Sequence, residues 1–341
     1  MTRGHSRQAA ASIPTLSVVV PMFNEEAVLP TFFARLEKTL ADLGVTYEII
    51  CVNDGSRDGT HRLLAEAHAR DPRIRVLNFS RNFGKEIALT AGLDHAKGAA
   101  VVPIDADLQD PPELIATFLE RWREGYEVVL GVRQNRNSDT WAKRVSAKAF
   151  YKVMNKMARI PIPANAGDFR LMDRRVVDTL RNVRERQRFM KGLFAWVGFR
   201  QCEVGYVRPE RSAGSSKFNY WGLWSFALDG ITGYSTAPLH VAAYLGSFTA
   251  LTAVLYGAFL VLRRLLFGTD VPGYTSTMVA VLFLGGVQLT VLGILGEYLG
   301  RVYEETKHRP LYIIDSALGW SPEDLSACGE WAANPQPDVS D

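Results

Sequence analysis

The stretch Ala99-Ala100-Val101-Val102-Pro103-Ile104-Asp105-Ala106-Asp107-Leu108-Gln109 decides the fold, because an apolar run ends there in two carboxylates and an amide. The apolar residues predict a buried strand that ends at Ile104. Side chains on an extended backbone repeat their direction every two residues, so Asp105 and Asp107 are expected to point the same way. Two like charges repel unless a cation lies between them, and oxygen ligands suit Mg²⁺ or Mn²⁺, which also bind substrate phosphates. The alternative is that both aspartates are turn formers before Pro111-Pro112.

Strand and helix signals alternate on both sides of this stretch, from Leu16 to Gly131. Short apolar runs predict strands at Leu16–Val20, Tyr47–Val52, Ile74–Phe79, Ala100–Ile104 and Glu127–Leu130. Periodic patterns predict helices between them at Glu26–Leu43, Thr60–Ala69, Lys85–His95 and Pro112–Arg123. This order predicts an α/β fold with a doubly wound, mostly parallel sheet and right-handed crossovers. Such sheets bind ligands beyond the carboxyl ends of their strands.

Polar clusters follow three of the predicted strands: Asn24-Glu25-Glu26, Asn53-Asp54-Gly55-Ser56 and Asp105 to Gln109. The three loops are therefore expected to meet at one edge of the sheet. Asp54 is placed to hydrogen-bond a nucleobase N–H or a ribose hydroxyl. Asp58 and Thr60 are interpreted as helix caps, and one of Glu25 and Glu26 as a first-turn helix charge.

Basic residues gather after the fifth predicted strand, at Arg133, Arg136, Lys143, Arg144 and Lys148. A solvated basic face is one interpretation, and anion binding beside a phosphate–metal site is the other. Residues 166–170 are expected to form a loop that carries Asp168 and Arg170. The segment from Arg211 to Lys217 predicts a flexible loop, with basic residues at both ends, that closes over a diphosphate.

The last third of the chain contains two long uncharged runs. No Lys, Arg, Asp or Glu occurs from Ile231 to Leu262 or from Val271 to Gly296. Each run exceeds the roughly 20 apolar residues that cross a bilayer, so a transmembrane hairpin is expected, with both flanks on one side. The basic residues outside it favour a cytoplasmic N-terminal domain, although Arg263 and Arg264 lie in the connecting loop. The aromatic residues of 218–236 predict interfacial helices.

Composition limits the remaining possibilities. A chain of 341 residues with a formal net charge of +3 is long enough for one large or two modest domains and gives no support for nucleic-acid binding. Three widely spaced cysteines indicate reduced thiols rather than disulfides or a metal site. The first fifteen residues lack the apolar core of a secretory signal peptide. The acidic segment after Trp320 is expected to be disordered.

These motifs together resemble the GT-A-fold glycosyltransferases of family 2, specifically the polyprenyl-phosphate glycosyltransferases (dolichol-phosphate mannose synthase and the bactoprenol glucosyltransferases). The resemblance runs from Leu16 to about Leu311. The segments that carry it are Val20–Glu26, Val52–Thr60, Arg81–Lys85, Asp105–Glu113, Gly214–Lys217 and Glu297–Glu305. Gln187-Arg188-Phe189-Met190-Lys191 departs from the QxxRW signature of processive synthases, so processive synthesis is not expected.

The resemblance implies a role for particular residues. The nucleotide pocket is expected to include Pro21, Phe23, Glu25, Val52 and Asp54. Asp105 and Ala106 are expected to touch the sugar nucleotide, while Asp107 and Gln109 hold the metal. The phosphate contacts, which complete the catalytic set with Asp105 and Asp107, are expected at Arg133, Arg211 and Lys217. Arg144 and Ser146 are expected at the acceptor phosphate, where the match is looser.

The resemblance further implies transfer of one hexose, glucose from UDP-glucose, to undecaprenyl or another polyprenyl phosphate at the cytoplasmic leaflet of the inner membrane. The reaction would be inverting and would need Mg²⁺ or Mn²⁺. Other donors (GDP-mannose, UDP-N-acetylglucosamine, a UDP-aminoarabinose derivative), a hydroxyl acceptor with Asp168 as base, and a non-enzymatic nucleotide-sugar scaffold remain open. A homo-oligomer also remains open, since hairpins could pack through Gly285-Gly286, Gly293 and Gly296.

The expected organisation follows from these assignments. A flexible N-terminus (1–14) precedes a GT-A catalytic domain (15–217) and interfacial helices (218–236). The transmembrane hairpin (237–300) has spans at about 237–262 and 273–296, and a cytoplasmic tail (301–341) ends the chain.

Overall fold

A computed structural model describes residues 14–133, 166–186, 188, 190–207, 237–267 and 273–326. The chain divides into two units. The first contains the described residues up to 207 and those from Arg309 onward, and the second contains those from 237 to His308. The candidate site lies in the first unit.

An eight-stranded mixed sheet forms the centre of the first unit, in the order β7-β5-β6-β4-β1-β2-β3-β8. Its strands are β1 (Leu16–Met22), β2 (Tyr47–Asn53), β3 (Ile74–Phe79), β4 (Ala100–Pro103), β5 (Val128–Arg133), β6 (Ala166–Asp173), β7 (Gln201–Tyr206) and β8 (Ile314–Leu318). Strands β4, β1, β2 and β3 run parallel to one another, and β5 and β7 form a second parallel pair. The antiparallel strand β6 joins these two parallel groups, and β8 runs antiparallel to β3.

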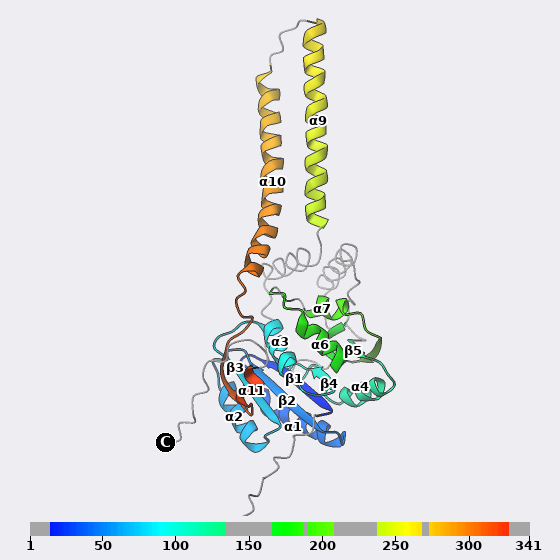
Figure 1. Cartoon of the computed structure of the whole chain (residues 1–341), viewed down its shortest axis with the longest axis vertical. Helices are drawn as coiled ribbons and strands as arrows, with labels where there is room; N and C mark the ends of the chain where they lie inside the picture. Colours follow the sequence, from blue (N-terminus) through cyan, green and yellow to red (C-terminus); the bar gives the residue numbers. More distant parts are fainter. Residues whose placement is uncertain are drawn as a thin grey trace, which may run out of the picture. The chain divides into compact units, whose positions relative to one another are not determined.

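Helices cover both faces of the sheet (Figure 1). The helices of the first unit are α1 (Leu29–Asp42), α2 (Thr60–Arg70), α3 (Lys85–His95), α4 (Leu114–Arg123), α6 (Arg174–Asn182), α7 (Met190–Trp196) and α11 (Pro322–Ser326). Alternate strand residues face opposite layers: Val18 and Val20 pack with α1, α2 and α4, whereas Val19 packs with α3, α6 and α7. Burial on both faces explains why the central strands are almost continuously apolar.

The predicted order of strands and helices up to residue 133 is confirmed, and the α/β fold with it. The largest shifts are three residues: α1 was expected from Glu26 and begins at Leu29, and β5 was expected to end at Leu130 and ends at Arg133. The fourth strand ends at Pro103 rather than Ile104. Residues 166–170, expected as a loop, belong to β6, because their alternate positions Gly167 and Phe169 are buried in the sheet. The sequence pattern predicted neither β7 nor β8.

The chain returns to the sheet after the second apolar helix. Strand β8 pairs with β3, Tyr312 is buried, and the Trp320 indole donates to the carbonyl of Val76 at 3.1 Å. Residues 322–326, expected to be disordered, form α11. The sequence contains the reason: Ser321 and Asp324 cap the helix reciprocally, at 3.2 and 3.3 Å. Part of the segment expected as a tail from residue 301 is therefore sheet and helix.

The second unit contains two long helices, α9 (Ala237–Phe267) and α10 (Tyr274–Thr306). Both are long and apolar enough to cross a membrane, at Pro238–Arg263 and Thr277–Thr306. Their large apolar side chains are exposed, for example Phe248 (70%) and Leu289 (72%). An apolar surface of this extent fits a lipid environment better than water. The helix α10 continues ten residues beyond the expected end of the second span at residue 296.

Candidate functional site

The loops after β1 and β2 are tied together by reciprocal hydrogen bonds. The backbone N–H of Asn24 donates to the Ser56 hydroxyl at 3.0 Å, and the N–H of Arg57 donates to the Asn24 side chain at 2.8 Å. The Glu25 N–H donates to the Thr60 hydroxyl at 3.0 Å. Asn24 has a positive φ of 56°, a conformation that asparagine tolerates better than most residues. The two polar clusters predicted to converge therefore do so.

Asp54 joins the loop after β3 to the same assembly. Its buried carboxylate accepts the N–H groups of Phe83 at 2.6 Å and Gly84 at 2.9 Å. Burial raises the pKa of Asp54, and the two N–H donors oppose that rise. Each carboxylate oxygen of Asp54 can still accept a second hydrogen bond, so the geometry leaves room for a nucleotide donor. Contact between Asp54 and a nucleotide stays a prediction.

Gly55 allows the loops after β2 and β3 to approach closely. Its φ is +66°, and an added Cβ would lie 2.5 Å from the carbonyl carbon of Arg81 and 2.6 Å from the nitrogen of Asn82. No side chain larger than hydrogen fits that space without a backbone shift. Three loops thus form one connected rim at the carboxyl ends of β1, β2 and β3.

The segment after β4 carries the two aspartates of the motif. The strand ends before them, residues 106 and 107 form a turn, and Leu108 has a φ of 59°. The expectation of an extended backbone through Asp107 is therefore wrong. Burial nevertheless alternates: Asp105, Asp107 and Gln109 are partly exposed, while the residues between them are buried. The Gln109 N–H donates to the Asp107 carboxylate at 3.1 Å.

A lysine ion-pairs with the first aspartate. The Lys85 ammonium lies 2.8 Å from carboxylate oxygens of both Asp105 and Asp168. Burial lowers the pKa of Lys85, but the two carboxylates raise it more, so its pKa lies above the ordinary value and the group is charged. Lys85 therefore supplies a positive charge beside Asp105, and the divalent ion expected at the motif stays a prediction. Lys85 begins α3, directly after the loop that Asp54 fixes.

The remaining donors fit a divalent ion that shares its ligands with a substrate. Asp107 and Gln109 offer carboxylate and amide oxygens at one partly exposed place, the hard ligands that Mg²⁺ and Mn²⁺ take. Within the part of the chain that the structure describes, no three His, Cys, Asp or Glu residues are grouped to hold a metal ion. An ion at Asp107 and Gln109 would therefore complete its shell with water and substrate phosphate oxygens.

A cluster of three charged residues adjoins Lys85: Asp168, Glu86 and Arg170. Burial raises the pKa of Asp168, but Lys85 lowers it more, so its pKa lies below the ordinary range. Burial raises the pKa of Glu86 to about 6, and Asp168 adds to that rise. Arg170 stacks on the Phe194 ring at 3.9 Å, and burial lowers its pKa to about 10. Among the described residues, one Asp168 oxygen and the Arg170 Nε are buried without a hydrogen-bond partner.

Arg133 is the member of the predicted basic cluster that lies within the described residues. Its Nε donates to the Tyr206 hydroxyl at 3.4 Å, and that hydroxyl donates to the buried Asp110. Gly167 lies against the guanidinium, since an added Cβ would be 3.2 Å from it. Burial lowers the pKa of Arg133, but Tyr206, Asp110 and Asp105 raise it more. Arg133 is therefore a fixed positive charge near the aspartate motif.

The other predicted site residues have different outcomes. Pro21 lies within β1, one residue before its end at Met22, and Phe23 follows that strand with 40% of its surface exposed. Ala106 is buried between the two aspartates, and Val52 is fully buried in β2. Their roles toward a nucleotide stay predictions. Four predicted residues lie outside the described residues: Arg144, Ser146, Arg211 and Lys217.

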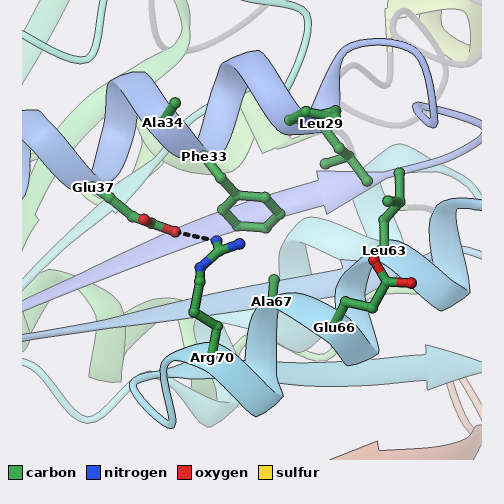
Figure 2. A pocket seen from close by; sticks show the side chains of 9 residues that line it. Leu29, Phe33, Ala34, Glu37, Leu63, Glu66, Ala67 and Arg70 are labelled. Carbon is green, nitrogen blue, oxygen red and sulfur yellow. Dashed lines mark hydrogen bonds and ion pairs between the residues drawn. The ribbon is translucent and has the colours of Figure 1, made fainter.

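Sequence reasoning missed the roles of Lys85, Glu86, Tyr206 and Asp110 at this edge. Lys85 ends a segment that carried the resemblance, and Glu86 follows it, but no spacing rule connects Lys85 with Asp105 or Asp168, which lie 20 and 83 residues away. A cavity of about 420 Å³ between α1 and α2 contains none of the predicted site residues. Figure 2 shows it lined by Phe33, with Glu37 and Arg70 paired beside the ring.

Comparisons with known proteins give one consistent result. The family model described as Glycosyl transferase family 2 matches residues 17–181, and the model described as GtrB C-terminal hairpin matches residues 237–302. "Uncharacterized glycosyltransferase sll0501" of Synechocystis sp. is 57% identical over 304 residues, which cover 89% of this chain and 96% of that protein. The bactoprenol glucosyl transferase of Shigella phage SfV is 50% identical over 299 residues, which cover 88% of this chain and 97% of that protein. The solved mannosyltransferase PcManGT from Pyrobaculum calidifontis, in complex with GDP-Man and Mn2+, aligns with a TM-score of 0.39 and 18% identity over 85% of this chain and 88% of that chain.

Proposed function

The chain belongs to glycosyl transferase family 2, and on that premise we propose that it transfers one glucose from UDP-glucose to undecaprenyl or another polyprenyl phosphate. The reaction takes place at the cytoplasmic leaflet of the inner membrane, inverts the anomeric carbon and depends on Mg²⁺ or Mn²⁺. The observation that carries the proposal is the 50% identity to a bactoprenol glucosyl transferase across 88% of the chain. That match is long enough to include both the catalytic domain and the apolar hairpin.

The chemistry of the acceptor suits this site. A phosphate monoester has a second pKa near 6, so its oxygen is already ionised at about pH 7 and needs no strong general base. A hydroxyl acceptor would need one, and Asp168 was the candidate. Because Lys85 holds the pKa of Asp168 below its ordinary range, this carboxylate is a weak base. The site therefore favours a phosphate acceptor over a sugar or protein hydroxyl.

The chain's cationic residues stabilise the charge that develops on the departing diphosphate. Arg133 is held in place by Tyr206, and Arg211 and Lys217 would add two more cations from their loop. Asp107 and Gln109 would hold the divalent ion, which supplies electrostatic stabilisation of the leaving group when bound. Asp105 and Ala106 would contact the sugar nucleotide, with Lys85 neutralising Asp105.

The reaction itself exchanges one bond for another. An acceptor phosphate oxygen attacks the anomeric carbon, and the bond from that carbon to the diphosphate breaks with its electron pair leaving on UDP. Attack from the side opposite the leaving group inverts the configuration. Arg144 and Ser146 would hold the acceptor phosphate for this attack, which gains from fixed orientation. The hairpin would keep the enzyme in the membrane that contains its lipid acceptor, which raises the local concentration of that acceptor.

A donor panel tests the proposal. The purified full chain is incubated with undecaprenyl phosphate and each of radiolabelled UDP-glucose, GDP-mannose and UDP-N-acetylglucosamine, with Mg²⁺ or Mn²⁺. Label from UDP-glucose that extracts into organic solvent supports the proposal. If only another donor gives extractable label, the proposed sugar is wrong and the proposed transfer to a lipid phosphate still holds. Binding of a sugar nucleotide without transfer would favour a non-enzymatic scaffold.

A further inference from the structure

A line of hydrogen bonds runs from β8 to the rim that the loops after β1, β2 and β3 form, where the nucleotide is proposed to bind. The Asn78 amide donates to the Ser316 hydroxyl at 3.1 Å, and the Asn53 amide donates to the Asn78 carbonyl oxygen at 2.9 Å. The Ser56 N–H then donates to the Asn53 carbonyl oxygen at 3.1 Å. The Ser56 hydroxyl finally accepts the Asn24 N–H at 3.0 Å. Four hydrogen bonds thus connect β8, β3, β2 and the loop after β1.

The register of the sheet makes this line possible. Asn53 lies opposite Asn78, and Asn78 lies opposite Ser316, so the three side chains are cross-strand neighbours. Asn53 and Asn78 are 3% and 4% exposed. A buried amide that loses its partner pays a desolvation cost, so each member fixes the orientation of the next.

We propose that Ser316, on the strand that follows the apolar hairpin, is a positioning residue for the sugar-nucleotide site. It holds Asn78, which holds Asn53, which in turn holds the N–H of Ser56 in the loop that presents Asp54. This inference rests on the proposed function for the identity of the ligand, but the hydrogen-bonded line itself does not. The segment after the hairpin therefore serves the catalytic domain and not only the edge of its sheet.

Three variants separate positioning from stability. S316A removes the hydroxyl that accepts the Asn78 amide, and S316T retains a hydroxyl. L318A is the matched control, because Leu318 lies on β8 opposite Val76, packs against the core and makes none of the four hydrogen bonds of the line. Each full chain is purified in detergent and measured for its melting temperature, its donor KM and kcat with UDP-glucose, and its amide hydrogen exchange at residues 54–57.

In S316A we expect exchange at Ser56 to rise by about tenfold and donor KM to rise by about three- to tenfold, with kcat within about twofold of wild type. S316T restores both values. L318A lowers the melting temperature but leaves exchange at Ser56 and the donor KM unchanged. Unchanged exchange in S316A, or an equal rise in L318A, overturns the inference. If the wild-type chain transfers no glucose, the proposed function fails while the exchange measurement still decides the role of Ser316.

Discussion

At the scale of single residues, Asp107 is the side chain on which the metal proposal depends. We expect Asp107→Ala to lower transfer by about 100-fold or more, because the leaving diphosphate loses an ion that stabilises its charge. The melting temperature should stay near that of wild type, since Asp107 is partly exposed. Asp42→Ala, an exposed aspartate at the end of α1, is the control and should keep full turnover. Wild-type turnover in D107A, or in excess EDTA, contradicts the metal role.

Lys85 should stabilise the fold only while its carboxylate partners are ionised. Its ion pair lowers the pKa of Asp168, so the stabilisation is present above the ordinary aspartate pKa and is lost as pH falls through the lower, folded-state pKa. We expect Lys85→Met to destabilise the chain at pH 7 by about 1–2 kcal/mol, since the ammonium is partly exposed. Thermal melts should show this difference shrinking toward about pH 3. A difference that is equally large in acid would contradict the assignment.

The raised pKa of Glu86 predicts that stability depends on pH in the opposite direction. Burial raises its pKa to about 6, so the folded chain binds the proton more tightly than the unfolded chain. Stability contributed by Glu86 therefore falls as pH rises from about 4.5 to about 6. Glu86→Gln keeps an oxygen for the Met190 N–H, which Glu86 accepts at 3.0 Å. We expect E86Q to melt above wild type at pH 8 and close to it at pH 5, whereas equal gaps at both values would refute the shift.

The sequence places several candidate residues at strand ends but does not reveal the contacts between them. Asp105, Asp107 and Asp54 could be placed because each follows an apolar strand, and strand ends of a parallel sheet meet at one edge. Lys85 could not be paired with Asp168, because that contact depends on the antiparallel insertion of β6 beside β4. The alternation argument for Asp105 and Asp107 assumed an extended backbone, but the chain turns at residues 106 and 107.

At the scale of elements, the loop after β2 can be tested with two glycines. Gly55 and Gly44 both have positive φ angles, +66° and +62°, so alanine strains the backbone at both positions. Of these two glycines, Gly55 has backbone atoms of another loop within 3 Å of the added Cβ, whereas Gly44 has no atom within 4 Å. We expect G55A and G44A each to lose about 1 kcal/mol of stability from backbone strain, while G55A alone also loses UDP binding, by about tenfold. Isothermal titration with UDP measures the difference, and equal binding by both variants would show that the contact is unimportant.

The elements that the sequence did not reveal share a physical reason. Strands β1 to β4 are buried on both faces and read as apolar runs, which a single sequence shows clearly. The strand β6 contains Asp168, which pairs with Lys85 far away in the sequence, and Arg170, which stacks on Phe194. The edge strand β8, with the sequence IDSAL, is only partly buried and has a weak apolar pattern. Tertiary pairing rather than local pattern selects these strands.

At the scale of the whole molecule, the pairing of β8 with β3 constrains how the chain crosses a membrane. Strand β3 precedes the two apolar helices and β8 follows them, yet both belong to one sheet. Any membrane crossings between them must therefore be even in number, which agrees with the two candidate spans found among the described residues. An even number of crossings places both flanks of the hairpin on one side of a membrane, and the distribution of basic residues predicts that this side is cytoplasmic.

Cysteine labelling in cells tests that topology. We expect a membrane-impermeant maleimide to label Leu266→Cys, near the end of α9, in intact cells. His308→Cys, just after α10, should react only after the cells are permeabilised, because it lies on the side of the catalytic domain. The wild-type chain gives the background from its native cysteines. Labelling of H308C in intact cells would contradict the cytoplasmic orientation.

Because β8 follows both apolar helices, its place in the sequence also determines when the sheet can be completed. A ribosome releases residues 314–318 only after both apolar helices have been synthesised, more than 230 residues after the β3 partner Asn78. Until then β3 has an open edge, a state prone to wrong pairing. Synthesis of both apolar helices thus precedes closure of the sheet, so a newly made chain can complete its sheet only after these helices have left the ribosome.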